Sequence, residues 1–201
     1  MRDQYPAKVR MDVEQVMYES AYAFAFMGYK CRSGRAENSD KRFEQGTLDA
    51  IRDGATGSLE SFLPSSYFNG MRADGKQYFD ATKLPPEVLA KQRELVERFH
   101  PKGTQLKGFT YNAMARNGNQ VLGPDMLSPS RFILCAAKNS KFDKNGEIYD
   151  CKGGTGQAVR VAYHYKIPVF NLLHPPHLER MWQFILNKHP KYQEKGPENN
   201  L

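Results

Sequence analysis

The chain has 201 residues, of which 40% are hydrophobic and 25% charged, and its formal net charge is +7. These totals are typical of one globular domain that buries a core of its own. Its three cysteines are too few for a disulfide framework, and no apolar run approaches the ~20 residues of a membrane-spanning helix. The N-terminal sequence MRDQYPAKVR lacks the apolar stretch of a signal peptide, so a cytoplasmic location without membrane contact is expected.

The positive charge suits an anionic partner such as nucleic acid, a nucleotide or phosphate. A solvated surface rich in lysine explains the same charge equally well.

Apolar spacing predicts alternating helices and strands along the chain. The first half is predicted to contain a helix over 12–27 ended by Gly28, a strand over 29–33, a helix capped by Asn38 or Ser39 and running to Asp53, a strand over 59–63 and a helix over 85–100. The second half is predicted to contain a helix over 106–120, a strand over 131–137, a helix over 156–166, a strand over 167–172 and a helix over 178–187.

This alternation predicts a single Rossmann-like α/β domain over 1–188, with a mostly parallel sheet flanked by helices. An aromatic loop over 64–84 is expected to pack against the domain, and residues 189–201 are expected to form a frayed tail. Because ligands bind at the carboxyl ends of parallel strands, the loops over 33–38 and 138–156 are expected to meet at the binding edge.

The strongest local signal is the segment KGGTGQAVRVA at 152–162, which follows a predicted strand and opens a predicted helix. Glycine allows the backbone to approach an anion, and a helix start offers free amides at the positive end of its dipole. The predicted phosphate-binding residues are Gly153, Gly154, Thr155 and Gly156. Arg160 is expected to reach the phosphate or to pair with an acid. The alternatives are a turn that only packs and a plain surface arginine.

A second signal is the segment CRSGRAENSDKRFEQG at 31–46, which runs from a predicted strand through a Ser-Gly turn into a helix. Asp40 falls early in this helix, where it accepts hydrogen bonds from ribose hydroxyls or from amides of the first helical turn. Glu44 is either a second polar contact or, as we favour, a solvated residue. The candidate ligand-binding residues of this segment are Ser33, Gly34, Arg35, Asp40 and Glu44.

Arg116 and Asn117 are further candidates, with ordinary surface polarity as the equal alternative. They are adjacent in a predicted helix, so their side chains leave it about 100° apart and only one is expected to face the site. His174 and His177 are separated by two prolines, and no cysteine or acid accompanies them. We therefore predict neither a metal site nor a cofactor.

Four motifs in order resemble the SLOG group of Rossmann-like proteins, which includes the DNA-processing protein DprA and the LOG phosphoribohydrolases. The resemblance is greatest to small SLOG-type proteins, many of them from phages. The family pattern runs SGGAxGAD with FE, then LPWxGFNG, then ARN with QVLG, then GGTGxAIRxA with IPVFNL. Its counterparts lie at 33–44, 63–70, 115–123 and 153–172.

Three departures from the family pattern concern the site. Arg35, Asn38 and Ser39 stand where the pattern has glycine or alanine, which makes the first loop bulkier. The position of the catalytic glutamate of the LOG turn PGGxGTxxE is held by Arg160. The strand that opens the family and ends in a Gly-Ser-Arg turn has no counterpart in residues 1–10, so either the strand has been lost or the start lies downstream of the usual one.

The resemblance implies a homodimer that binds a nucleotide or nucleotide-derived, phosphate-bearing ligand, in the host cytoplasm if the protein is phage-encoded. One alternative is an N-glycosidase of the phosphoribohydrolase type that acts on nucleoside monophosphates, with Asp40 or Glu44 in place of the missing glutamate. Others are a DprA-like binder of single-stranded DNA that stacks bases on the loop at 64–83, and a phage structural or assembly component that keeps the fold without the ligand.

Overall fold

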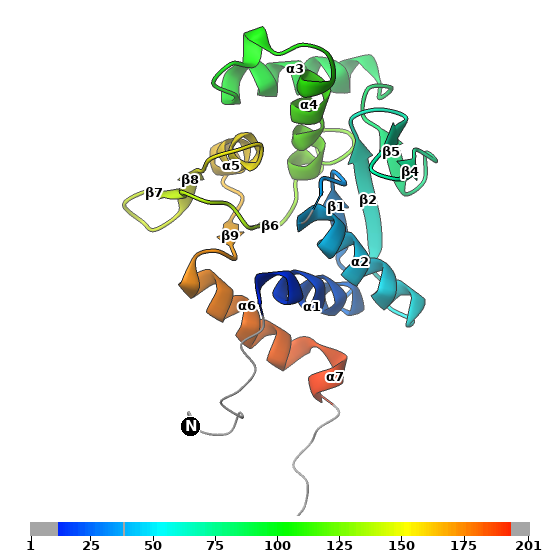
Figure 1. Ribbon diagram of the computed structural model, residues 1–201, viewed down its shortest axis with the longest axis vertical. Coiled ribbons are helices and arrows are strands. Elements are labelled where there is room, and N and C mark those ends of the chain that lie inside the picture. Colours follow the sequence, from blue (N-terminus) through cyan, green and yellow to red (C-terminus); the bar gives the residue numbers. More distant parts are fainter. Residues whose placement is uncertain (1–11, 38, 194–201) are drawn as a thin grey trace, which may run out of the picture.

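The computed structural model describes residues 12–37 and 39–193, and Figure 1 labels its elements in chain order. The helices are α1 Val13–Phe26, α2 Ser39–Arg52, α3 Pro86–Phe99, α4 Gly108–Leu122, α5 Thr155–His164, α6 Pro175–Lys188 and α7 Pro190–Gln193. The strands are β1 Lys30–Ser33, β2 Ser58–Leu63, β3 Tyr67–Phe68, β4 Met71–Arg72, β5 Tyr78–Asp80, β6 Ile133–Cys135, β7 Lys141–Phe142, β8 Ile148–Asp150 and β9 Val169–Asn171. Every helix and strand predicted from apolar spacing is present, with shifted ends.

The parallel strands form two separate sheets. In one, the order is β1-β2-β5, and in the other β6 pairs with β9; both sheets are parallel. The pairs β3–β4 and β7–β8 are small antiparallel hairpins. The chain therefore has a mixed α/β fold, with parallel strands flanked by helices. None of the described helices is long and apolar enough to cross a membrane.

Local chemistry explains how α1 begins, ends and packs. The Asp12 side chain caps its start by accepting the amide of Gln15 at 2.7 Å, and Gly28 ends it with a φ of +78°. The helix then packs closely on α2 at Gly46, where an added Cβ would lie 2.2 Å from the carbonyl oxygen of Tyr18. Glycine therefore permits this helix crossing.

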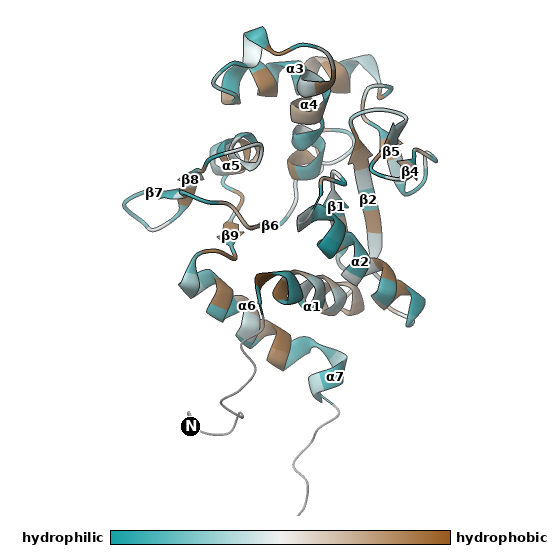
Figure 2. Ribbon diagram, in the orientation of Figure 1, coloured by the Kyte–Doolittle hydropathy of each residue, from teal (hydrophilic) through white to brown (hydrophobic). Residues whose placement is uncertain are grey.

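The core is divided among three clusters, each beneath a different group of elements. One lies around α4 and α5, one between α1 and α6, and one on β2 and β5. Figure 2 shows that, in contrast to these apolar clusters, hydrophilic residues gather at the start of α2, beside β1. Polar side chains therefore lie where β1 ends, and this is the edge that carries the candidate site.

The single parallel sheet that was expected is divided into two, and three further features differ from the sequence-based expectation, all of them involving short elements. The loop at 64–84 contains β3, β4 and β5, and β5 extends the sheet while Tyr78 is buried. The polar segment after β6 contains the β7–β8 hairpin. Residues 189–193 are not a frayed tail, because α7 is present and His189 is buried with its Nε2 2.8 Å from Oε2 of Glu19. Strands of two or three residues are too short for their periodicity to be read.

Candidate functional site

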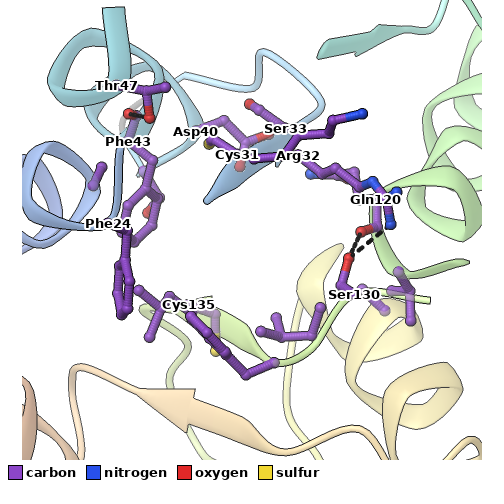
Figure 3. A pocket seen from close by; sticks show the side chains of 18 of the residues that line it. Phe24, Cys31, Arg32, Ser33, Asp40, Phe43, Thr47, Gln120, Ser130 and Cys135 are labelled. Atoms are coloured by element: carbon purple, nitrogen blue, oxygen red, sulfur yellow. Dashed lines mark hydrogen bonds between the residues drawn. The ribbon is translucent and has the colours of Figure 1, made fainter. Parts of the chain in front are cut away.

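A cavity of about 750 Å³ lies between β1 and β6, the facing edges of the two parallel sheets. Figure 3 shows β1 on one side of the cavity and Cys135 of β6 on the opposite side, with Phe24 and Phe43 forming a third wall. Gln120 and Ser130 lie across from the two aromatic rings. The cavity is therefore enclosed by strand edges in one direction and by side chains of the flanking helices in the other.

Half of the predicted site residues line this cavity and half do not. Those that line it are Ser33, Asp40, Arg116, Asn117, Gly154 and Thr155. They come from the two segments that were expected to meet at the carboxyl ends of the strands, and from α4. The cavity thus brings together residues that are more than 100 positions apart in the chain.

Arg116 is the central charged group of the cavity. Its side chain is only 9% exposed, and Nη1 donates to Oδ1 of Asn117 at 2.6 Å and to Oε1 of Gln120 at 2.5 Å. Nη2 is 4.0 Å from Oδ2 of Asp40, and Nε has no hydrogen-bond partner among the described residues. Burial lowers the pKa of Arg116, against the opposing effect of Asp40 and Glu44, but a guanidinium remains protonated. A buried cation with an unpaired donor is costly, and an anion would relieve that cost.

Asp40 organises the loop that follows β1. Its Oδ2 accepts the amides of Gly34 at 3.2 Å and Ala36 at 3.0 Å. These amides precede the helix, so they are not the first-turn amides that a capping role predicted. Oδ1 has no hydrogen-bond partner in the parts of the chain at 12–37 and 39–193, and it remains an acceptor for a hydroxyl group.

The charged residues that line the cavity are mostly cationic. Asp40 is the only carboxylate among its described lining residues, whereas four cationic residues line it: Lys30, Arg32, Arg116 and Arg131. Lys30 and Arg32 are both paired with Glu60, which does not line the cavity. The remaining positive charge of the lining favours an anionic guest.

Asn117 connects α4 to the glycine-rich turn. Its Nδ2 donates to the carbonyl oxygen of Gly154 at 3.2 Å and to Oε1 of Gln157 at 3.0 Å. Arg116 and Asn117 both line the cavity, so the expectation that only one would face it is wrong. The long Arg116 side chain reaches back to Asn117 and overcomes their angular separation on the helix.

The glycine-rich turn opens α5 as predicted, but it follows a different strand. It comes after β8 of the antiparallel hairpin, and the parallel strand β6 ends well before it. Gly153 has a φ of +85°, and the amide of Gly156 donates to the carbonyl oxygen of Gly153 at 3.1 Å. Within the described segments, the amides of Thr155 and Gln157 have no hydrogen-bond partner. Thr155 lines the cavity, so the start of α5 faces it.

Glu44 and Arg35 lie outside the cavity and pair with each other. Glu44 is fully buried, where Oε1 accepts from Oγ of Ser61 at 2.7 Å and Oε2 lies 2.5 Å from Nη1 of Arg35. The favoured interpretation of Glu44 as a solvated residue is therefore wrong. The Arg35 side chain turns away from the cavity, so its bulk does not fill the space where the family pattern has a small residue. Of the other two replacements, Ser39 lines the cavity and Asn38 lies outside the described residues.

Arg160 also lies outside the cavity. Its Nη1 pairs with Oδ1 of Asp150, and its Nε donates to the carbonyl oxygen of Phe99 at 2.5 Å. Of the two roles expected for Arg160, the structure shows the pairing with an acid. Gly153 and Gly156 shape the turn without lining the cavity, and an added Cβ at Gly156 would lie 2.2 Å from the carbonyl oxygen of Cys151.

His174 and His177 are close to each other and to Phe142. Nδ1 of His177 accepts the amide of Asn171 at 3.0 Å, so this nitrogen serves the end of β9. In the described part of the chain, no group of three or more histidine, cysteine or acidic residues could hold a metal ion.

Sequence reasoning missed several residues of the cavity. Gln120 lies four positions after Arg116, a spacing that places the two side chains on one helix face and could have been noticed. Arg131 is the first residue of the strand predicted over 131–137, and Ser130 immediately precedes that strand. Phe24 and Phe43 lie within two of the predicted helices, and nothing in their spacing indicates an open space beside them.

Gly34 is expected to be essential for the position of Arg116. An added Cβ at Gly34 would lie 2.2 Å from Cζ of Arg116, whose buried side chain has little room to move. We expect Gly34→Ala to lower the free energy of unfolding by about 2 kcal/mol, measured by urea denaturation. Gly154→Ala is the matched control, because its Cβ would meet only the terminal Met114 Cε at 3.4 Å and its backbone is already helical. Equal losses in the two variants would contradict this account.

Comparison with known proteins leaves the site to be interpreted from its own geometry. No protein-family model, curated protein or solved structure matches the chain.

Proposed function

We propose that this protein is a Rossmann-like binding protein for a phosphate-bearing nucleotide or nucleotide derivative. The observation that carries the proposal is the buried guanidinium of Arg116, a residue that lines the cavity at the start of α5 and whose Nε has no hydrogen-bond partner among the described residues. A phosphate placed there would receive hydrogen bonds from Arg116 and from the free amides of the first helical turn. This combination supports an anion site more strongly than either feature alone.

The order of the strands supports the same position. Starting from the cavity, β1, β2 and β5 follow one another in one direction, while β6 and β9 follow in the other. In doubly wound α/β folds, ligands bind outside the carboxyl ends of the strands at the point where the order reverses. Gly34 immediately follows β1 and contacts Arg116, so the proposed anion site lies at that end of β1.

The position of Asp40 favours a nucleotide over free phosphate as the ligand of the cavity. Its Oδ2 is used by two loop amides, which hold the carboxylate in place, whereas Oδ1 is available to accept a hydroxyl group. A ribose joined to the bound phosphate carries hydroxyl donors at a suitable distance for this carboxylate. We therefore assign the phosphate to Arg116 and the sugar to Asp40.

No specific observation favours the alternative functions. A glycosidase that uses two carboxylates would need a second acid, but Glu44 is occupied by Arg35 and Ser61 away from the cavity. For single-stranded DNA, Tyr67 is an exposed aromatic side chain in the loop at 64–84, but Tyr78 of the same loop is buried in the core. Binding without turnover is the simplest function that this site supports.

Calorimetric titration with AMP, ADP-ribose and inorganic phosphate tests the proposal. We expect AMP or ADP-ribose to bind with a Kd on the order of micromolar and phosphate to bind more weakly, because phosphate does not engage Asp40. No measurable heat with any of the three would overturn the proposal. Chromatography of the incubated AMP sample tests for turnover, because release of adenine would establish the glycosidase alternative instead.

A further inference from the structure

The edge of β6 that faces the cavity carries free backbone groups. The amide of Ile133 donates to Pro168 at 2.8 Å, and the carbonyl oxygen of Cys135 accepts the amide of Leu172 at 2.7 Å, both on the side of β9. Successive residues of a strand direct their amide and carbonyl groups to opposite edges of the strand. The amide and carbonyl groups of Leu134, which lies between Ile133 and Cys135, therefore point away from β9 and toward the cavity. Every residue from 132 to 136 lines the cavity, as expected when a strand presents its edge to it.

The edge of β1 that faces the cavity also directs backbone amide and carbonyl groups into it. The carbonyl oxygen of Tyr29 accepts the amide of Ser58 at 3.3 Å on the side of β2, so the backbone groups of Lys30 and Arg32 point the other way. All residues from 29 to 33 line the cavity. Two strand edges that have no partner among residues 12–37 and 39–193 therefore face each other across one space, and buried backbone groups without partners are costly.

The walls and the size of the space match one further strand. Apolar side chains close it from both faces, including Phe24 and Ala25 of α1 on one side and Val121 and Ala158 on the other. One strand residue occupies about 160 Å³, given a rise of ~3.3 Å, a strand spacing of ~4.8 Å and a layer depth of ~10 Å. The cavity of about 750 Å³ is therefore large enough for a short strand segment of at most roughly five residues.

We propose that this cavity is an acceptor slot for a β-strand supplied by another polypeptide. The strand would lie parallel to β1 and β6 and would join the two sheets into one, in the order β5-β2-β1-strand-β6-β9. Its backbone would pair with Lys30 and Arg32 on one edge and with Leu134 on the other. Because the slot is covered by helices on both faces, the strand would be a continuous apolar run.

The N-terminal segment of this chain is a poor candidate for the slot on chemical grounds. Its sequence MRDQYPAKVRM contains Pro6, which has no amide to donate, and the charged Lys8 and Arg10. Charged side chains are unfavourable in a strand that is buried on both faces. Residues 1–11 therefore do not have the chemistry that the slot favours in its occupant.

This inference does not rest on the proposed function. The strand would occupy the part of the cavity between β1 and β6, and the proposed anion site lies at the end of the same cavity, at Arg116 and Asp40. Nucleotide binding is measured by calorimetry and strand binding by fluorescence anisotropy, so a failure of one is distinguishable from a failure of the other.

The test uses the full chain and a fluorescein-labelled peptide, Lys-Lys-Val-Ile-Val-Ile-Val-Lys-Lys. We expect saturable binding by fluorescence anisotropy, together with slower hydrogen exchange at the amides of Arg32 and Leu134. The control peptide has the same side chains but N-methyl groups on both isoleucines, and it should bind at least ~10-fold more weakly because it lacks those hydrogen-bond donors. Equal binding of the two peptides, no binding, or protection at amides elsewhere would overturn the proposal.

Two variants locate the bound peptide. Leu134→Pro removes an amide that faces the slot and leaves the bonds of Ile133 and Cys135 to β9 in place, so peptide binding should fall by ~10-fold or more. Ala158→Leu narrows the slot and should have the same effect if the proline variant does not fold. Ala55→Leu, at a half-buried alanine that does not line the cavity, is the matched control and should bind normally.

A deletion of residues 1–11 distinguishes the source of the strand. The proposal predicts that the full chain and the deletion variant bind the peptide equally. If only the deletion variant binds it, the N-terminal segment itself holds the slot, and assignment to a separate polypeptide is wrong.

Discussion

Replacement of Arg116 by glutamine is expected to weaken AMP binding by roughly 100-fold, because the bound phosphate would lose a buried charged donor. Glutamine keeps an amide near Asn117 and Gln120, so the change is directed mainly at the charge. Isothermal calorimetry against AMP measures the loss. Arg52→Gln is the matched control, because this arginine lies on α2 with a side chain that is 72% exposed, and its variant should bind AMP normally.

The stability of the Arg116 variant separates a binding role from a structural one. Burial disfavours the charged guanidinium, and its nearest carboxylate, that of Asp40, is 4.0 Å away. Removing an incompletely paired buried charge should leave the free energy of unfolding within about 1 kcal/mol of the original value, or raise it. A large loss of stability with unchanged AMP affinity would show that Arg116 supports the fold and that the proposed anion site is wrong.

The sequence allowed the long elements and part of the site to be predicted, because both depend on local patterns. The spacing of apolar residues places α1 and α3, and the glycine-rich segment places the start of α5. Ser33 and Thr155 line the same cavity as expected, but the reason holds only for Ser33, which ends the parallel strand β1, because Thr155 follows the antiparallel β7–β8 hairpin.

The remaining features depend on partners that no local pattern reveals. Glu44 is buried because Ser61, 17 positions away, and Arg35 satisfy its two oxygens. β5 has three residues and is recognisable only through its pairing with β2. The cavity could not be predicted either, since it arises where two sheets fail to pair, and the sequence showed only that residues 1–10 lack a strand of the family type.

Replacement of Glu44 by alanine is expected to lower the free energy of unfolding by about 3–5 kcal/mol. Its carboxylate is fully buried and pairs with Arg35, whose side chain is 17% exposed. The variant would leave the Arg35 guanidinium without its counter-charge and Ser61 without its acceptor. Urea denaturation measures the change.

A double variant distinguishes the cost of an unpaired charge from the value of the pair. Replacing Arg35 and Glu44 together by methionine fills similar volume without leaving a buried charge, so the loss should be smaller than ~2 kcal/mol. A double variant as unstable as Glu44→Ala would show that the pair itself stabilises the fold. Because Glu44 does not line the cavity, AMP affinity of the folded Glu44→Ala protein should be unchanged, whereas a catalytic or ligand-binding role for this acid would require it to fall.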